Sequence, residues 1–316
     1  MEEARSRRSG SVELCALASY GPDVMPPDLP FQMVSLTRSE IQAVLEEEIR
    51  QLLLKAKGSC LPRLVLILSR CRSGSTALLN VFGLAGYPSL YQPLKACIRR
   101  KLVGSEAEPL FDEGYLSQPV LVIKETYGPY VLPECTFSPV TALVQAGYPR
   151  DLLHTVHLDR HPVATFSSWK KKWLHRRPLE ILWRNFVIAT MNARSVEQSV
   201  SELGLAATTY VHELSSDPER AIGALFKRIK LDPLAPVGSL IHWGTKGQLD
   251  TPNAAFLQAS EPKQFELPGL HGTHAAYQYE KRVDTPLEEL IDPEIGEQLL
   301  TMWKNNVRKA CVDLQL

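Results

Sequence analysis

The sequence contains no run of about 20 apolar residues, the length that a membrane-spanning helix needs. Its first twenty residues lack the apolar core and the small-residue cleavage site of a secretory signal peptide. The six cysteines lie scattered without a C-x-x-C pair, which argues against a zinc ribbon or a disulfide framework and favours a reducing compartment. These absences predict a cytoplasmic protein with no membrane partner.

An excess of charge of one sign is also absent. The 35 Lys and Arg residues balance the 35 Asp and Glu residues, so the formal net charge is zero. Proteins that bind nucleic acid through their overall charge are strongly basic, so we expect no nucleic-acid partner. The chain of 316 residues is 44% hydrophobic and long enough to bury a sizeable core.

The first part of the chain divides into a tail and a helix. Residues 1–30 are rich in Ser, Arg and Pro without sustained periodicity, and we expect a flexible tail there. Ser39 and Gln42 are spaced as a capping box, and Gly58 would end the helix that they begin. One face of this predicted helix is apolar: Ile41, Val44, Leu45, Ile49, Leu52 and Leu53.

From residue 60 onward, strand-like and helix-like segments alternate. The predicted strands are Arg63–Ser69, Ser89–Gln92, Val120–Glu125, Leu152–Asp159 and Thr208–His212. The predicted helices are Thr76–Leu84, Val140–Gly147, Val163–Trp173, Leu179–Leu203, Pro218–Ile229 and Pro293–Val312. The strands are apolar without clean alternation, as in a sheet covered on both faces. We therefore predict a single α/β domain over residues 31–316, with a mostly parallel central sheet flanked by helices.

Residues 231–285 depart from this alternation. They carry many Pro, Gly, His and polar residues and show little periodicity. A long loop-rich region inside a compact domain is typical of a lid or a wall of a substrate site, and equally of plain irregular surface.

The segment LVLILSRCRSGSTALLNVFG, residues 64–83, has the layout strand, polar loop, helix. A helix N-terminus offers unpaired N–H groups and a positive dipole end to an anion. Gly74 permits close approach of the backbone, Ser75 and Thr76 add amides and hydroxyls, and Arg72 adds a permanently charged fork. On its own the segment fits equally an anion-binding loop and a ligand-free turn.

Three other phosphate chemistries lack their residues here. A phosphatase loop of the Cys-x5-Arg kind needs Arg where the chain has Ala77. A hydrolase elbow needs G-x-S-x-G, and no second glycine stands in place for it. A P-loop kinase needs Lys directly before the Ser or Thr, where the chain has Gly74, and a magnesium-binding acid.

A second basic and hydroxylic element follows the strand Leu152–Asp159. Arg160 stands at the end of this strand, Pro162 suits the first turn of a helix, and Ser168 lies about two turns into that helix. Ligands of open α/β sheets collect at the carboxyl ends of the strands, so both elements would meet at one edge. Two anion sites at one edge predict an extended ligand with two anionic groups, such as a nucleotide phosphorylated at both ends of its ribose.

The loop Arg72-Ser73-Gly74-Ser75-Thr76 together with Arg160-x-Pro162-x5-Ser168 resembles the sulfotransferases that use 3'-phosphoadenosine 5'-phosphosulfate. The Arg in the loop is closer to the carbohydrate and bacterial type. The resemblance covers roughly residues 60–230 and implies that the first loop wraps the 5'-phosphosulfate while Arg160 and Ser168 hold the 3'-phosphate. It also implies that Lys246, in a Lys-Gly pair, completes the 3'-phosphate site. The stretch Val211–Glu219 is similar to a third, weaker family motif.

Some positions differ from the family pattern. His161 replaces an Asp or Asn, and Val211 replaces a Tyr that often touches adenine. Many relatives carry a catalytic Glu before a Pro after the second strand. This chain has Gln92-Pro93 there, and the amide of Gln92 cannot act as a base.

Sulfuryl transfer, like phosphoryl transfer, needs in-line positioning and preorganised positive charge. We expect Arg72 to stabilise the bridging oxygen of the leaving nucleotide. Lys124 and Glu125 follow an apolar strand and should emerge at the same sheet edge, Glu125 as the general base and Lys124 as a charge toward the sulfuryl group. A structural ion pair is the alternative for these two residues. No cluster has metal-ligand spacing, so we expect no metal.

The predicted function is therefore metal-independent sulfuryl transfer from 3'-phosphoadenosine 5'-phosphosulfate to a hydroxyl or amine of a small molecule or glycan. The basic run Trp169–Trp173 with Arg176 and Arg177 is either a solvated helix face or an attractor of an acidic acceptor. The alternatives are a divergent P-loop kinase and a non-catalytic nucleotide-binding protein on the same fold. The oligomeric state stays open.

Overall fold

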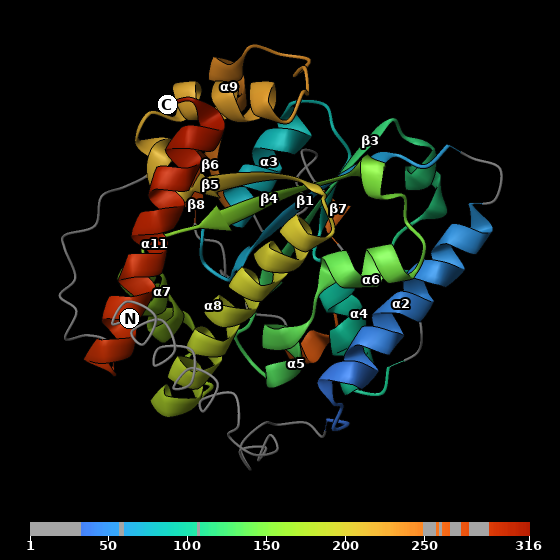
Figure 1. The fold of residues 1–316 in the computed structure, drawn as a ribbon, viewed down its shortest axis with the longest axis vertical. Coiled ribbons are helices and arrows are strands. Elements are labelled where there is room, and N and C mark those ends of the chain that lie inside the picture. Colours follow the sequence, from blue (N-terminus) through green and yellow to red (C-terminus); the bar gives the residue numbers. More distant parts are fainter. Residues whose placement is uncertain are drawn as a thin grey trace, which may run out of the picture.

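A computed structural model describes residues 33–56, 60–105, 108–248, 257–258, 261–265, 273–277 and 291–316, and for 243–248, 257–258 and 273–276 it describes the backbone alone. The predicted tail over residues 1–30 lies outside the described residues. The described residues form one α/β domain around a six-stranded sheet (Figure 1).

The central sheet is parallel throughout, in the order β5-β4-β1-β3-β2-β7. Its strands are β1 (Arg63–Arg70), β2 (Ser89–Tyr91), β3 (Val120–Tyr127), β4 (Leu153–Asp159), β5 (Ala206–Val211) and β7 (Leu257–Gln258). The five predicted strands all form, with ends that shift by at most two residues. Nearly every residue of β1, β3 and β4 is buried, because helices cover both faces of the sheet.

Two apolar clusters fill the space between the sheet and its helices. On one face pack α3 (Ser75–Leu84), α9 (Pro218–Arg228) and α10 (Val237–Leu240). On the other face pack α2 (Arg38–Lys55), α4 (Pro93–Leu102), α5 (Leu132–Thr136), α6 (Pro139–Gln145), α7 (Pro162–Trp173) and α8 (Leu179–Glu202). The last helix, α11 (Pro293–Leu314), lies along β5 and contacts α7 and α9.

The capping box predicted for the first helix is wrong by two residues. The N-cap is Thr37, whose hydroxyl accepts from Glu40 N at 3.3 Å, while Glu40 Oε2 accepts from Thr37 N at 2.7 Å. Thr37 and Glu40 already satisfy the first amides of the helix, so Ser39 lies inside it. The helix ends at Lys55, and Gly58 lies outside the described residues.

Helices α4 and α5 are absent from the elements predicted above. Helix α4 has the sequence PLKACIRRKL, and its basic residues Lys95, Arg99 and Arg100 are buried. Buried charges break the apolar pattern from which a helix is predicted. They become stable only with partners from other elements, which the tertiary structure supplies.

Residues 231–285 are more regular in their described parts than their composition suggests. They contribute α10, strand β7 and a single-turn helix, η4 (Lys263–Phe265). They also contribute a separate antiparallel pair of strands, β6 (His242–Gln248) and β8 (Thr273–Ala276). Strand β7 is parallel to β2 at the side of the main sheet. Its carboxyl end therefore lies at the same edge as the carboxyl ends of the other strands, where ligands of such sheets bind.

Candidate functional site

The predicted phosphate loop joins β1 to α3. Gly74 is the N-cap of α3 with φ of +87°, and Arg72 has φ of +70°. A Cβ on Gly74 would lie 2.6 Å from Nδ1 of His212, so the loop tolerates no side chain there. With this geometry the loop leads directly into α3, whose first turn holds Ser75 and Thr76. An anion could therefore approach the backbone amides at the helix N-terminus.

Ser73 carries a polar atom without a protein partner. Its side chain is 0% exposed, and among the described residues its Oγ has no hydrogen-bond partner. A buried hydroxyl costs free energy unless it is hydrogen-bonded. An anion held by the loop would satisfy it, which fits the predicted role of Ser73.

The structure brings the two predicted anion-binding elements into direct contact. Arg72 Nε donates to Oγ of Ser168 at 3.0 Å, and Arg160 Nη1 donates to the carbonyl oxygen of Arg72 at 3.0 Å. Strands β1 and β4 are neighbours, so their following loops leave the sheet side by side. Trp169 adds a third link by donating from Nε1 to Cys71 O at 2.7 Å. Residues from two distant motifs thus form one basic and hydroxylic cluster.

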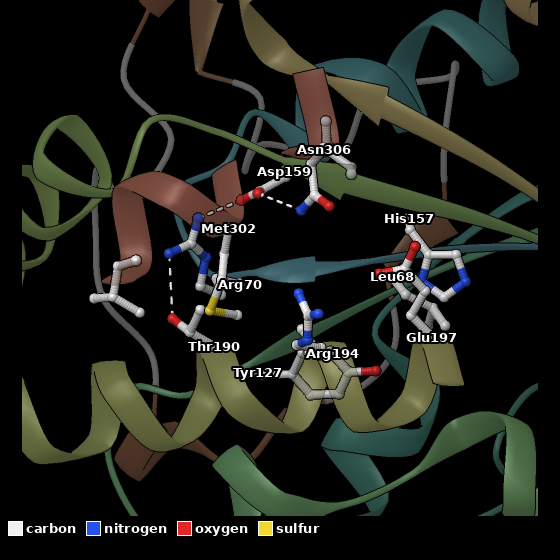
Figure 2. A pocket seen from close by; sticks show the side chains of 13 residues that line it. Leu68, Arg70, Tyr127, His157, Asp159, Thr190, Arg194, Glu197, Met302 and Asn306 are labelled. Carbon is white, nitrogen blue, oxygen red and sulfur yellow. Dashed lines mark hydrogen bonds and ion pairs between the residues drawn. The ribbon is translucent and has the colours of Figure 1, made fainter. Parts of the chain in front are cut away.

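Arg70 stabilises this cluster through an ion pair and hydrogen bonds, a role that was not predicted. Its guanidinium forms an ion pair with Asp159 and donates to Thr190 at 3.2 Å (Figure 2). It also donates to Arg160 O at 2.8 Å. Asp159 in turn accepts from Asn306 of α11 at 2.7 Å. The cavity beside these side chains measures about 40 Å³, room for a few water molecules and too little for a nucleotide.

Lys124 lies on the face of β3 that meets the phosphate loop. Its Nζ is 3.3 Å from Thr76 Oγ1 and 3.7 Å from the ring centre of Tyr91. Burial lowers the pKa of Lys124 to about 7, because a buried ammonium loses its hydration. An anion in the loop would favour the charged form.

Glu125 points to the opposite face of the same strand, since successive side chains of a strand alternate. Its carboxylate accepts from Leu94 N at 2.7 Å and from Lys95 N at 3.2 Å, at the N-terminus of α4. Burial raises the pKa of Glu125 to about 8 against these two hydrogen bonds, which lower it. Lys124 and Glu125 therefore do not form the ion pair that was the alternative to their catalytic roles. Glu125 anchors α4 on the face opposite the phosphate loop, and its role as general base stays a prediction.

The remaining predicted positions have mixed outcomes. Lys246 falls in β6, whose side chains lie outside the described part of the chain, so its role stays a prediction. In the basic run, Trp169 and Trp173 are buried while Lys171 is exposed, as on an amphipathic helix.

No group of three or more His, Cys, Asp or Glu side chains that could hold a metal occurs among the described residues. None of the described helices is long and apolar enough to cross a membrane.

No family model and no curated protein matches this sequence. Among solved structures, the chain is similar to the "Sulfotransferase Domain from the Curacin Biosynthetic Pathway". The two share 16% sequence identity, with a TM-score of 0.46, over 78% of this chain and 99% of that domain.

Proposed function

We propose that this protein is a sulfotransferase that moves a sulfuryl group from 3'-phosphoadenosine 5'-phosphosulfate to a hydroxyl or amine of a small molecule or glycan. The observation that carries the proposal is the contact between Arg72 and Ser168, with Arg160 bonded to the same loop. One ligand that reaches both elements needs an anionic group at each end. A nucleotide with 5'- and 3'-phosphates has this form.

Each residue has a distinct role in the proposed donor site. The amides of Gly74, Ser75 and Thr76, with the Ser73 hydroxyl, hold the 5'-phosphate at the start of α3. Arg160 and Ser168 hold the 3'-phosphate, and Lys246 remains a candidate for the same group. Arg72 lies between them, where a guanidinium can neutralise charge that develops on the bridging oxygen as the S–O bond breaks. Lys124 adds positive charge on the acceptor side of Thr76.

Sulfuryl transfer requires the protein to supply positive charge and to position the reacting groups. The sulfuryl transition state is loose, with its negative charge spread over the oxygens, so fixed cations stabilise it more than the ground state. The residues above supply that charge without a metal ligand set. The acceptor then attacks the sulfur in line with the departing nucleotide.

Calorimetric titration with adenosine 3',5'-bisphosphate, in the presence of a metal chelator, tests the proposal. We expect saturable binding by the native protein and at least about tenfold weaker binding by Arg160→Ala, because a charge-assisted hydrogen bond contributes about 1.5–3 kcal/mol. A parallel titration with Mg-ATP tests the kinase alternative. Binding of Mg-ATP alone would overturn the proposal in favour of a kinase, and binding of neither ligand would overturn nucleotide binding altogether.

A further inference from the structure

The segment after β7 lies at the edge of the sheet that carries the phosphate loop. Strand β7 pairs with β2 in parallel, with Leu257 beside Leu90 and Gln258 beside Tyr91. Because the strands are parallel, the chain leaves β7 at the same carboxyl edge as it leaves β1 and β3. Glu261 follows three residues after Gln258 and therefore belongs to this edge.

Arg99 of α4 fixes the position of Glu261. Its Nη1 donates to Glu261 Oε2 at 2.8 Å, while its Nε donates to Glu134 Oε1 at 2.8 Å. The guanidinium lies 4.7 Å from the ring centre of Phe265 and 5.7 Å from that of Tyr130. Burial opposes the charge of Arg99, but Glu134 and Glu261 outweigh it and raise its pKa. Glu261 is thus held by a permanent cation with fixed orientation.

Three carboxylates bind Leu94, Lys95 or Arg99 of α4, and of these Glu261 is the one that solvent reaches. Glu125 and Glu134 are 0% exposed, and backbone amides or Arg99 engage both oxygens of each. The side chain of Glu261 is 19% exposed. Among the described residues, its Oε1 receives only a long 3.5 Å contact from the amide of Gln92. This oxygen can accept a hydrogen bond from an incoming molecule.

A short series of contacts connects Glu261 to the phosphate loop. Thr76 of the loop helix contacts Lys124 Nζ, and Lys124 Nζ lies over the ring of Tyr91. Gln92 follows Tyr91 directly and touches Glu261. The amide of Gln92 cannot accept a proton as a base. Glu261, 169 residues later in the sequence, places a carboxylate next to that amide.

We propose that Glu261 is the general base that receives the proton of the acceptor, an inference that rests on the proposed sulfotransferase function. The acceptor O–H or N–H bond breaks and its proton passes to Glu261 Oε1. The acceptor atom forms a bond to sulfur while the bond from sulfur to the 5'-phosphate oxygen breaks, and that electron pair leaves with the bisphosphate. A carboxylate at this point also favours an acceptor whose reacting end is neutral or cationic.

Kinetics of Glu261 variants with probe acceptors test this assignment. The probes are p-nitrophenol, a primary alcohol and a primary alkylamine, with sulfur-labelled donor. We expect Glu261→Gln to lower kcat at least about 100-fold, the usual scale of general-base catalysis, and to leave the affinity for adenosine 3',5'-bisphosphate within about twofold. Glu261→Asp keeps the carboxylate and should recover part of the rate.

Glu108→Gln is the matched control, because Glu108 pairs with Arg100 next to Arg99 but is largely exposed. It should keep the native rate. A Glu261→Gln variant that keeps the native kcat overturns the role of Glu261 alone. If that variant does not fold, Glu261→Ala decides, since an unchanged kcat in a folded Ala variant, which has no carboxylate, also overturns it. A native protein that binds the bisphosphate but transfers sulfur to none of the probes contradicts the proposed function itself.

Discussion

Arg72 and Ser168 are 96 residues apart in the sequence and joined by a hydrogen bond of 3.0 Å from Nε to Oγ. The bond connects the loop after β1 to the helix after β4. It sets the spacing between the two groups that we assign to opposite ends of one nucleotide. The geometry of the proposed donor site therefore depends on the packing of α7 against the loop after β1 as well as on the loop sequence.

Ser168→Ala removes the acceptor of this bond and a donor to the proposed 3'-phosphate. We expect the affinity for adenosine 3',5'-bisphosphate to fall about fivefold or more, because a hydrogen bond contributes about 1 kcal/mol. Titration calorimetry measures the change. Ser167→Ala is the control, as the neighbouring hydroxyl has no assigned role and its loss should leave the affinity unchanged. Equal affinities of the native protein and Ser168→Ala would contradict the assignment.

Gly74→Ala tests the close approach of the loop to α3. A side chain at Gly74 would require φ of +87° and would meet the ring of His212 at 2.6 Å. We expect bisphosphate binding to weaken at least about tenfold, since the loop must move to admit the Cβ. Gly104→Ala imposes a similar positive φ with nothing within 4 Å, and it should leave binding intact. Native-like binding by Gly74→Ala would show that the loop does not hold the anion through this backbone geometry.

Lys124 should make donor binding depend on pH. Burial lowers its pKa to about 7, so its ammonium loses a proton as the pH rises through that value, whereas the bound anion favours the charged form. We therefore expect the affinity for the bisphosphate to fall between pH 7 and pH 9. Lys124→Met should bind weakly without this dependence on pH. A native affinity that is constant from pH 6 to pH 9 would remove Lys124 from the donor site.

Glu125 variants separate an anchoring role from a catalytic one. Glu125→Ala leaves the buried amides of Leu94 and Lys95 without their acceptor, and should lower the free energy of unfolding by at least about 1–3 kcal/mol. Glu125→Gln keeps an acceptor oxygen but is a poor base. Denaturant unfolding and the rate of sulfuryl transfer are measured together. A stable Glu125→Gln protein that has lost its turnover would return the role of general base to Glu125.

The polar residues around α4 show why part of the site escaped prediction. Lys95, Arg99 and Glu134 look like ordinary surface residues in the sequence, yet they are buried against one another. No local pattern predicts which distant charge will pair with which, because each pairing depends on the packing of separate elements. Lys124 and Glu125 lie adjacent in the sequence, but the alternation of β3 sends them to opposite faces.

The sequence by itself determined the alternation of strands and helices, the loop Arg72–Thr76 and the second element from Arg160 to Ser168. These follow from local properties, namely apolar runs, a helix start and basic residues at strand ends. Only the tertiary structure decided that Arg72 meets Ser168, that Glu125 anchors α4 and that Glu261 lies beside Arg99 and Gln92. Such relationships arise from strand order and packing, which join residues that the sequence keeps far apart.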